Sequence, residues 1–357
     1  MTNKLKIIFY NFISSLIALI LSFLIGGFLI ILIGKNPIFV YSRFISDTLG
    51  STYGISQVLF RATPLMFTGL AAGISFRSGL FNVGAEGQLN IGMFATALAG
   101  VYLGDLPSII LLPLCLIIGM IAGGIWGGIP GILKAKYGAH EVINTIMMNF
   151  IATALISYFI INVFAVPATV HTPEISENAQ IGRLDIFFPI LRGSPVNVSL
   201  FIALITCIVI YLILWKTPFG YELRTIGLNP NAALYGGINT SNRTIIALTL
   251  SGAVAGLVGS NFIMGYKHYY ELGFADGIGF IGIAVALLAK NHPIGIIFTA
   301  IFFGTLDYGS LAINTIVPKE LSNILQAIVI ICMIIITKLM NRWILYKHKK
   351  LLITQNA

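Results

Sequence analysis

The stretch "SIILLPLCLIIGMIAGGIWGGIPGIL", residues 108–133, contains no charged side chain. The hydrocarbon core of a bilayer is about 30 Å thick, so a helix needs about 20 apolar residues to cross it. This stretch therefore predicts a transmembrane helix. The whole chain has the same character, because 57% of its 357 residues are hydrophobic and 9% are charged. A soluble domain carries about 25% charged residues. We therefore expect an all-α polytopic membrane protein.

Ten apolar runs predict about ten transmembrane helices. The eighth run is short, and we expect it to pack inside the bundle. The first run is too long for the core of a signal peptide, so we expect it to be retained as a span. The runs cover about 9–33, 57–75, 86–104, 108–133, 141–165, 198–215, 244–264, 276–290, 293–312 and 321–340.

The basic residues predict the orientation of these helices. An even number of spans places both termini on one side of the membrane. With the N-terminus inside, about twice as many of the 21 Lys and Arg residues fall in or beside cytoplasmic segments as outside. We therefore expect cytoplasmic N and C termini. Residues 1–357 are expected to form a single transmembrane domain, with an external loop at 166–197 and a cytoplasmic loop at 216–243.

Several classes of function are not supported by the composition and motifs. The net charge of +9 is attributed to cytoplasmic loops and lipid headgroups, because no basic stripe with interleaved aromatic residues indicates nucleic-acid binding. No G-x-x-x-x-G-K-[ST], H-E-x-x-H or G-x-S-x-G motif occurs. The three cysteines lie inside apolar runs as small hydrophobic residues. We expect no catalytic residue and no metal site.

The segment "FRSGLFNVGAEGQLNIGMFA", residues 76–95, is polar within an otherwise apolar chain. Asparagine and glutamine offer donors and acceptors without net charge, and aromatic faces can stack on a base. Such side chains can replace the hydration of a polar solute, and five residues here are candidates for its path: Phe81, Asn82, Glu86, Gln88 and Asn90. The alternative is that Glu86 and Asn90 only bond the backbone of a broken helix.

A second polar stripe lies on "GAHEVINTIMMNFIA", residues 138–152, where Asn144 and Asn149 recur near helical spacing. Asn149 lies deep enough to be a pathway candidate, and we add Asn144. His140 and Glu141 fall at the rim, where a gate, a contact with a partner and a solvated helix cap remain alternatives. Asp276, near a third Gly-rich segment, completes the predicted pathway set.

The loop stretch "ELRTIGLNPNAALYGGI", residues 222–238, has the signals of a short helix. Asn229 before Pro230 is suited to an N-cap followed by a first helical position. Gly236 follows about two turns later and can end the helix. Gly227 is expected to permit a bend before it. We predict a short surface helix parallel to the membrane, with an ordinary loop as the alternative.

This loop resembles the coupling-helix motif of ATP-binding-cassette importer permeases, most of all the group that serves sugars, nucleosides and branched-chain amino acids. The matching residues are Glu222, Arg224, Gly227, Asn229, Pro230, Ala232, Ala233, Gly236 or Gly237, and Ile238. Residues 76–94, 138–152 and 273–295 also resemble these permeases, so the resemblance covers about 57–340. The Phe-Asn-x-Gly-x-Glu-Gly-Gln run is the most specific. In relatives an aspartate often stands just before "GIAVALL", whereas this chain has Phe280–Ile281 there and Asp276 a turn earlier.

The resemblance implies a permease subunit that moves nucleosides, or simple sugars, through the bacterial cytoplasmic membrane by alternating access. It implies three partners: a separate ATPase, a second paralogous permease and an external substrate-binding lipoprotein. The chain itself would need no cofactor, since ATP and Mg would be used by the ATPase. The resemblance also implies that one set of residues, here called the coupling set, transmits the movement of the ATPase to the permease. Its members are Glu222, Arg224, Gly227, Asn229, Pro230, Ala232, Ala233 and Gly236.

Two other classes remain as alternatives, namely an ion-coupled secondary transporter or channel for a small polar solute, and a membrane enzyme or scaffold. Few ionisable residues lie within the predicted spans, and no convergent nucleophile or metal set is present. Residues 76–104 and 273–312 resemble one another roughly and cross in opposite senses in the predicted topology. They therefore predict an inverted repeat with broken helices and a path at the repeat interface.

Overall fold

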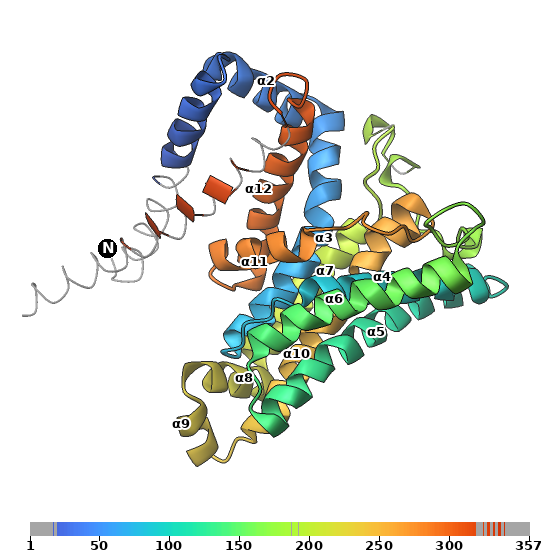
Figure 1. Ribbon diagram of the computed structural model, residues 1–357, viewed down its shortest axis with the longest axis vertical. Coiled ribbons are helices and arrows are strands. Elements are labelled where there is room, and N and C mark those ends of the chain that lie inside the picture. The colour runs from blue at the N-terminus through green and yellow to red at the C-terminus, as the bar shows by residue number, and fades with distance from the viewer. Residues whose placement is uncertain are drawn as a thin grey trace, which may run out of the picture. The chain divides into compact units, whose positions relative to one another are not determined.

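A computed structural model describes residues 20–318 except 187 and 192, together with residue 17 and scattered positions between 324 and 339. In these residues the regular structure is helical, apart from two isolated bridges, His171–Glu271 and Arg183–Asn197. Figure 1 labels most of the helices. The α-helices are α2 (Pro37–Leu49), α3 (Thr52–Arg77), α4 (Ala85–Tyr102), α5 (Ser108–Tyr137), α6 (Glu141–Phe159), α7 (Ser199–Lys216), α8 (Pro218–Leu228), α9 (Pro230–Tyr235), α10 (Thr240–Gly256), α11 (Ile278–Leu288) and α12 (Pro293–Ala312).

Short turns extend or join these helices. The π-helical turns η1 (Ile160–Phe164) and η5 (Ser260–Lys267) continue the paths of α6 and α10. The predicted external loop contains three 3-10 turns, η2 (Glu177–Ala179), η3 (Leu184–Ile186) and η4 (Pro189–Leu191). The described part of residues 166–197 is therefore locally ordered and contains no long helix.

Six described helices are long and apolar enough to cross a membrane, so the chain is a multi-pass membrane protein. They correspond to the predicted runs at 57–75, 108–133, 141–165, 198–215, 244–264 and 293–312. A seventh span is reached if Ile20–Leu32 and α2, bent by 119°, are counted as one. The predicted run at 321–340 and the first part of the run at 9–33 lie largely outside the described residues.

Two of the predicted spans form helices that do not meet the length and composition of a span. The run at 276–290 becomes α11, which has 11 residues and is therefore about 16 Å long. This is about half of the hydrocarbon thickness. The run at 86–104 becomes α4, whose first turns hold Glu86, Gln88 and Asn90. The total of about ten spans and the cytoplasmic termini stay predictions.

The described chain divides into two compact units, and the described residues within 1–50 and 308–357 form the first. Asn36 caps α2 by accepting the Ile38 and Phe39 amides. A small apolar core joins the helix Ile20–Leu32, α2 and the residues after α12 through four buried side chains, Ile30, Val40, Ile313 and Val317. The expectation of one domain over residues 1–357 stays a prediction.

The second unit, 51–307, contains the helices from α3 to α11 and most of α12. α10 packs along α5 through glycines spaced four residues apart, where Gly123 faces the carbonyl of Gly252 and Gly119 faces that of Gly256. Side chains larger than hydrogen would keep these backbones apart, which is why small residues recur where membrane helices meet. α3 is almost wholly buried and contacts α7, α10 and α11.

Residues 172–181, in the predicted external loop, are hydrogen-bonded to the end of η5 and to the residues that follow it. The Ile181 amide donates to Met264, the Ile175 amide to His268, and the Thr172 amide to Tyr270, at 2.8, 2.7 and 2.9 Å. Three successive backbone contacts therefore hold residues 264–270 in place. That segment leads directly into α11.

Candidate transport pathway and coupling site

The turn between α3 and α4 is organised by Asn82, which is fully buried. Its Nδ2 donates to Gln88 Oε1 at 2.9 Å and to Ser251 Oγ of α10 at 2.8 Å. Its Oδ1 accepts the Gly84 amide at 2.9 Å. Buried amide groups cost free energy when unpaired, and here both ends of the Asn82 side chain are paired. Asn82 therefore links the turn, α4 and α10.

Glu86 joins two helices at their first turns. It lies in the first turn of α4, and its carboxylate accepts the amide of Gly277 at 2.8 Å and that of Gly279 at 2.7 Å. These amides belong to the start of α11, where backbone N–H groups have no partner within the helix. A carboxylate is favoured at such an end by the helix dipole. The N-termini of α4 and α11 are thus held together by one side chain.

Asn90 and Asn149 attach α4 to further elements. Asn90 Nδ2 donates to the Glu86 carbonyl at 2.9 Å, and its Oδ1 accepts the Tyr270 hydroxyl at 3.0 Å. Asn149 of α6 accepts the Gly87 amide at 2.8 Å and donates to the Val83 carbonyl at 3.0 Å. Each side chain is 8% exposed. The polar stripe on α6 therefore faces the start of α4.

The eight predicted pathway residues fall into two groups. Five are buried and bonded to the protein: Asn82, Glu86, Gln88, Asn90 and Asn149. This geometry favours the alternative that they hold a broken helix, and their contact with a solute stays a prediction. The other three differ. Phe81 is 40% exposed and its ring contacts that of Phe76. Asp276 is exposed, and the Nδ2 of Asn144 has no hydrogen-bond partner among the described residues.

The predicted coupling loop is a pair of short helices, α8 and α9, next to the start of α10 (Figure 1). Asn229 caps α9, since its Oδ1 accepts the amides of Asn231 and Ala232 at 3.0 and 3.1 Å, and Pro230 takes the first helical position. Gly236 follows Tyr235 as the C-cap. The predicted short helix and both of its ends are confirmed.

The predicted bend at Gly227 is wrong, because α8 continues through it to Leu228. Gly227 is needed for a different reason. A Cβ there would collide with the carbonyl of Arg77, and the Cα of Gly227 lies 3.0 Å from where a Cβ of Gly79 would stand. The last turn of α8 thus lies directly against the backbone that connects α3 to α4.

The two charged residues of the coupling set have partners within the protein. Glu222 forms an ion pair with Arg243 of α10. The guanidinium carbon of Arg224 lies 5.6 Å from the ring centroid of Trp215, and its Nε donates to the Gly220 carbonyl at 3.4 Å. Both side chains therefore fix α8 to its neighbours, and their contact with an ATPase stays a prediction.

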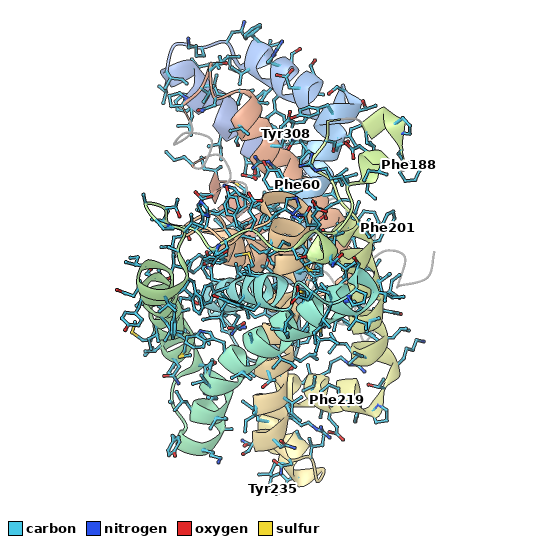
Figure 2. All side chains as sticks on the ribbon, turned by 90° about the vertical axis from the view of Figure 1, so that its right-hand side faces the viewer. Phe60, Phe188, Phe201, Phe219, Tyr235 and Tyr308 are labelled. Carbon is cyan, nitrogen blue, oxygen red and sulfur yellow. The ribbon has the colours of Figure 1, made fainter. Side chains whose placement is uncertain are left out.

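The tip of this pair of helices exposes apolar side chains. Leu228, Leu234 and Tyr235 are 88%, 62% and 94% exposed, whereas Ala233 is 1% exposed. Ala232 is also exposed. Figure 2 shows Tyr235 at the extremity of the α9 region and Phe219 nearer the bundle. Exposed apolar patches of this kind are typical of protein interaction surfaces.

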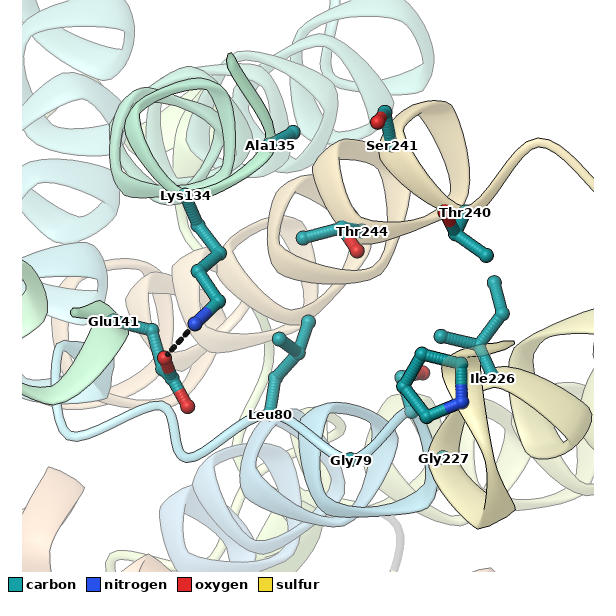
Figure 3. A pocket seen from close by; sticks show the side chains of 12 residues that line it. Gly79, Leu80, Lys134, Ala135, Glu141, Ile226, Gly227, Thr240, Ser241 and Thr244 are labelled. Atoms are coloured by element: carbon teal, nitrogen blue, oxygen red, sulfur yellow. Dashed lines mark ion pairs between the residues drawn. The ribbon is translucent and has the colours of Figure 1, made fainter. Parts of the chain in front are cut away.

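A cavity of about 390 Å³ lies where α8 and α9 meet the other helices. It is lined by residues of the α3–α4 turn and of α5, α6, α8, α9 and α10. Figure 3 shows Lys134 and Glu141 on one side of this cavity and Ile226 on the other. The Nζ of Lys134 lies 2.8 Å from the Oε2 of Glu141. Glu141 therefore pairs with α5, and its predicted alternatives as gate, partner contact or cap remain predictions. No cluster of three His, Cys, Asp or Glu residues suited to a metal occurs within the described residues.

The fold defines a class of protein, a helical multi-pass membrane protein. Residues 54–334 match the family described as "Branched-chain amino acid transport system / permease component", and the chain belongs to that family. It is therefore a transport component and not an enzyme.

Curated relatives narrow this class. The chain is 36% identical to the nucleoside ABC transporter permease protein NupB of Lactococcus lactis, over 88% of each chain. It is 38% identical to the guanosine ABC transporter permease protein NupP of Bacillus subtilis, over 88% of this chain and 91% of the relative. A glucose ABC transporter permease protein of Haloferax volcanii is 32% identical, over 87% and 83%. A second permease from each of the first two organisms, NupC and NupQ, also matches. No solved structure matches the chain.

Several residues of the site were not singled out from the sequence. Tyr270, Gly277 and Gly279 lie in or beside the segment 273–295, whose glycines were a visible signal of close backbone approach. Arg243 ends the predicted loop, but its pairing with Glu222 across 21 residues had no signature. Trp215 could not be predicted either, because its contacts with Arg77 and Arg224 depend on the path of the folded chain.

Proposed function

We propose that this chain is the permease subunit of an ATP-driven importer that moves nucleosides, or related sugars, across the bacterial cytoplasmic membrane. Membership of the permease family and the names of two relatives at 36% and 38% identity carry this proposal. The nucleoside is placed before the sugar because the glucose relative is less similar, at 32%. Alternating access then moves the solute past a bundle whose helices α4 and α11 meet at Glu86.

The proposed partners follow from two features. The exposed tip of α9, including Leu234 and Tyr235, is apolar and aromatic, as is typical of side chains that bind in a groove of a partner protein. We assign that groove to a separate ATPase, which would use the ATP and Mg. Paired permeases in two relatives' organisms favour a second, paralogous permease beside this chain. An external binding lipoprotein would deliver the solute. The chain itself would hold no cofactor.

The conformational change caused by ATP would pass from α9 toward the pathway, beginning with contacts between backbones. α9 adjoins α8, and Gly227 of α8 lies on the Arg77 carbonyl at the end of α3. The turn that follows carries Asn82, which bonds to Gln88 of α4. A movement of α8 thus reaches the start of α4 through the backbone of this turn and the hydrogen bond between the Asn82 and Gln88 side chains. Within this path the coupling roles of Glu222 and Arg224 are to keep α8 attached to α10 and α7.

The solute path is proposed along the exposed polar and aromatic groups near the start of α11. Asp276 is exposed and precedes that helix, and Phe81 and Asn144 keep unsatisfied faces or donors. The buried group around Asn82 and Glu86 would set the width of the path. We retain about ten spans, cytoplasmic termini and an inverted repeat as part of this proposal, since α4 and α11 both begin at broken, Gly-rich segments.

Reconstitution tests the proposal. The complex of this chain with its ATPase and second permease is placed in proteoliposomes, and uptake of radiolabelled nucleosides and glucose is measured with and without ATP. We expect ATP-dependent uptake that nucleosides support better than glucose. Uptake driven by an ion gradient in the absence of the ATPase would overturn the proposal. The Asp276→Asn variant is expected to lower uptake while the complex still assembles.

A further inference from the structure

Two arginines from different parts of the chain share one tryptophan. The guanidinium carbon of Arg77, at the end of α3, lies 5.1 Å from the centroid of the Trp215 ring, and that of Arg224 in α8 lies 5.6 Å from it. The His292 ring lies 5.0 Å from the same centroid. Cation–π attraction explains why each guanidinium lies near the indole. It does not explain how two like charges are kept together.

Among the described residues, no carboxylate pairs with either arginine. Arg77 donates to the carbonyls of Asn291 and Lys290 at 3.0 and 2.7 Å. Arg224 donates from Nε alone, and its nearest acid in sequence, Glu222, pairs with Arg243 instead. Neutral carbonyls do not cancel two positive charges. Guanidinium groups with donors to spare are suited to bind the oxygens of a phosphate.

An apolar stripe on α7 leads to this group. Phe201, Ile205, Ile208 and Leu212 recur at helical spacing and are 46%, 58%, 50% and 47% exposed. Trp215 follows at the next helical step, at the border of the stripe. From Phe201 to Trp215 the helix rises about 21 Å, which exceeds the roughly 15 Å of hydrocarbon in one leaflet. The stripe is long enough to accommodate a whole acyl chain.

We propose that Arg77, Arg224 and Trp215 form a binding site for an anionic phospholipid. The phosphate lies between the two guanidinium groups, and an acyl chain lies along the exposed face of α7. Trp and basic residues together mark the headgroup level of membrane proteins, and each basic residue there attracts anionic lipid. The bound phosphate neutralises the charge where α3, α7 and α8 meet, and so keeps α8 docked. A free phosphate ion could use the arginines but not the stripe.

The test measures lipid bound to the full chain in its purified complex. The complex is incubated in mixed micelles with equal mole fractions of phosphatidylglycerol and phosphatidylcholine, and co-purifying lipid is quantified by mass spectrometry. We expect wild type to retain phosphatidylglycerol preferentially, and Arg224→Gln to retain about tenfold less, as for loss of one charge-assisted contact. Lys136→Gln removes an exposed charge at the end of α5 that stacks on no tryptophan among the described residues, and should retain as much as wild type.

A second measurement uses wild type alone, so that it does not depend on how a variant folds. Phosphatidylglycerol should raise the thermal unfolding midpoint of the complex, whereas phosphatidylcholine and millimolar inorganic phosphate should not. If inorganic phosphate raises the midpoint equally, the site takes a free anion and the lipid proposal is wrong. Equal retention by wild type and Arg224→Gln, or equal retention of the two lipids, would overturn it as well. None of these readouts depends on transport.

Discussion

The carboxylate of Glu86 accepts the backbone amide of Gly279 at 2.7 Å, and through its other oxygen it also accepts Gly277 at 2.8 Å. A single side chain thus satisfies two amides that helix geometry leaves without partners. The same contact brings together the first turns of α4 and α11, which are far apart in sequence. Glu86 therefore links the start of α4 to the start of α11.

Glu86→Gln is expected to destabilise the protein. The amide side chain keeps one acceptor and turns an N–H₂ donor toward a backbone donor, so one amide of α11 loses its partner at a cost of about 1–3 kcal/mol. The midpoint of thermal or denaturant unfolding in detergent measures this loss. Asp276→Asn is the matched control, because that carboxylate is exposed. A control that lost as much stability as Glu86→Gln would contradict the assignment.

The double variant Leu234→Ala, Tyr235→Ala should be as stable as wild type but should bind the ATPase subunit more weakly. Both side chains are exposed, at 62% and 94%, so their truncation leaves no cavity in the chain. Buried interface aromatics commonly contribute 2 kcal/mol or more, which is at least about thirtyfold in affinity. Co-purification of the ATPase subunit measures this effect. Tyr137→Ala removes another exposed tyrosine, 76% exposed at the end of α5, and should co-purify normally.

Gly252→Ala should separate α5 from α10. The added Cβ would meet the carbonyl of Gly123 inside van der Waals distance, and overpacking of this kind costs about 1–3 kcal/mol. Gly236→Ala is the control, because the nearest atom to its added Cβ is 3.4 Å away. Thermal unfolding of both variants is compared with wild type. Equal midpoints for the two variants would show that the helices tolerate the methyl group.

His292 should make stability depend on pH. Burial lowers the pKa of His292, and the charge of Arg77 lowers it further. The unfolded chain, with a pKa near the usual value of about 6.5, therefore takes up this proton at a higher pH than the folded chain. The contribution is constant above about pH 6.5 and stability is lost as the pH falls below that value.

The His292→Gln variant isolates this effect from other titrating groups. Between about pH 7.5 and about pH 5, the unfolding midpoint of wild type should fall more than that of the variant. The aromatic rings of Tyr211 and Trp215 adjoin this histidine, so a change in their fluorescence provides a local readout. Parallel pH profiles for the two proteins would show that His292 does not titrate in this range.

The helices were predictable where apolar length alone decides them. The run expected at 293–312 is α12, Pro293–Ala312, and the N-cap of α9 at Asn229 followed from its own side chain. α11 was counted as a span because its residues are strongly apolar, although it has only 11 of them. Composition shows that a segment avoids water, but not whether the segment crosses the bilayer or ends within it.

The site was predictable in its residues and not in its contacts. Glu86 and Asn82 were conspicuous as polar groups in an apolar chain, but Gly277 and Ser251 lie 191 and 169 residues away from them. Gly227 was recognised as a special position for a wrong reason, since periodicity cannot reveal that a carbonyl of α3 would occupy the place of its side chain. Long-range pairing of this kind requires the folded path of the chain.

The contact between Glu86 and α11 also sets an order of events during synthesis. Glu86 is synthesised 191 residues before Gly277, so its carboxylate lacks these donors while the four long helical segments that begin with α5, α6, α7 and α10 are inserted. A carboxylate without partners is costly in hydrocarbon. The late arrival of α11 therefore completes a part of the protein begun much earlier. A chain truncated before residue 277 would therefore lack the backbone amides that bind the Glu86 carboxylate.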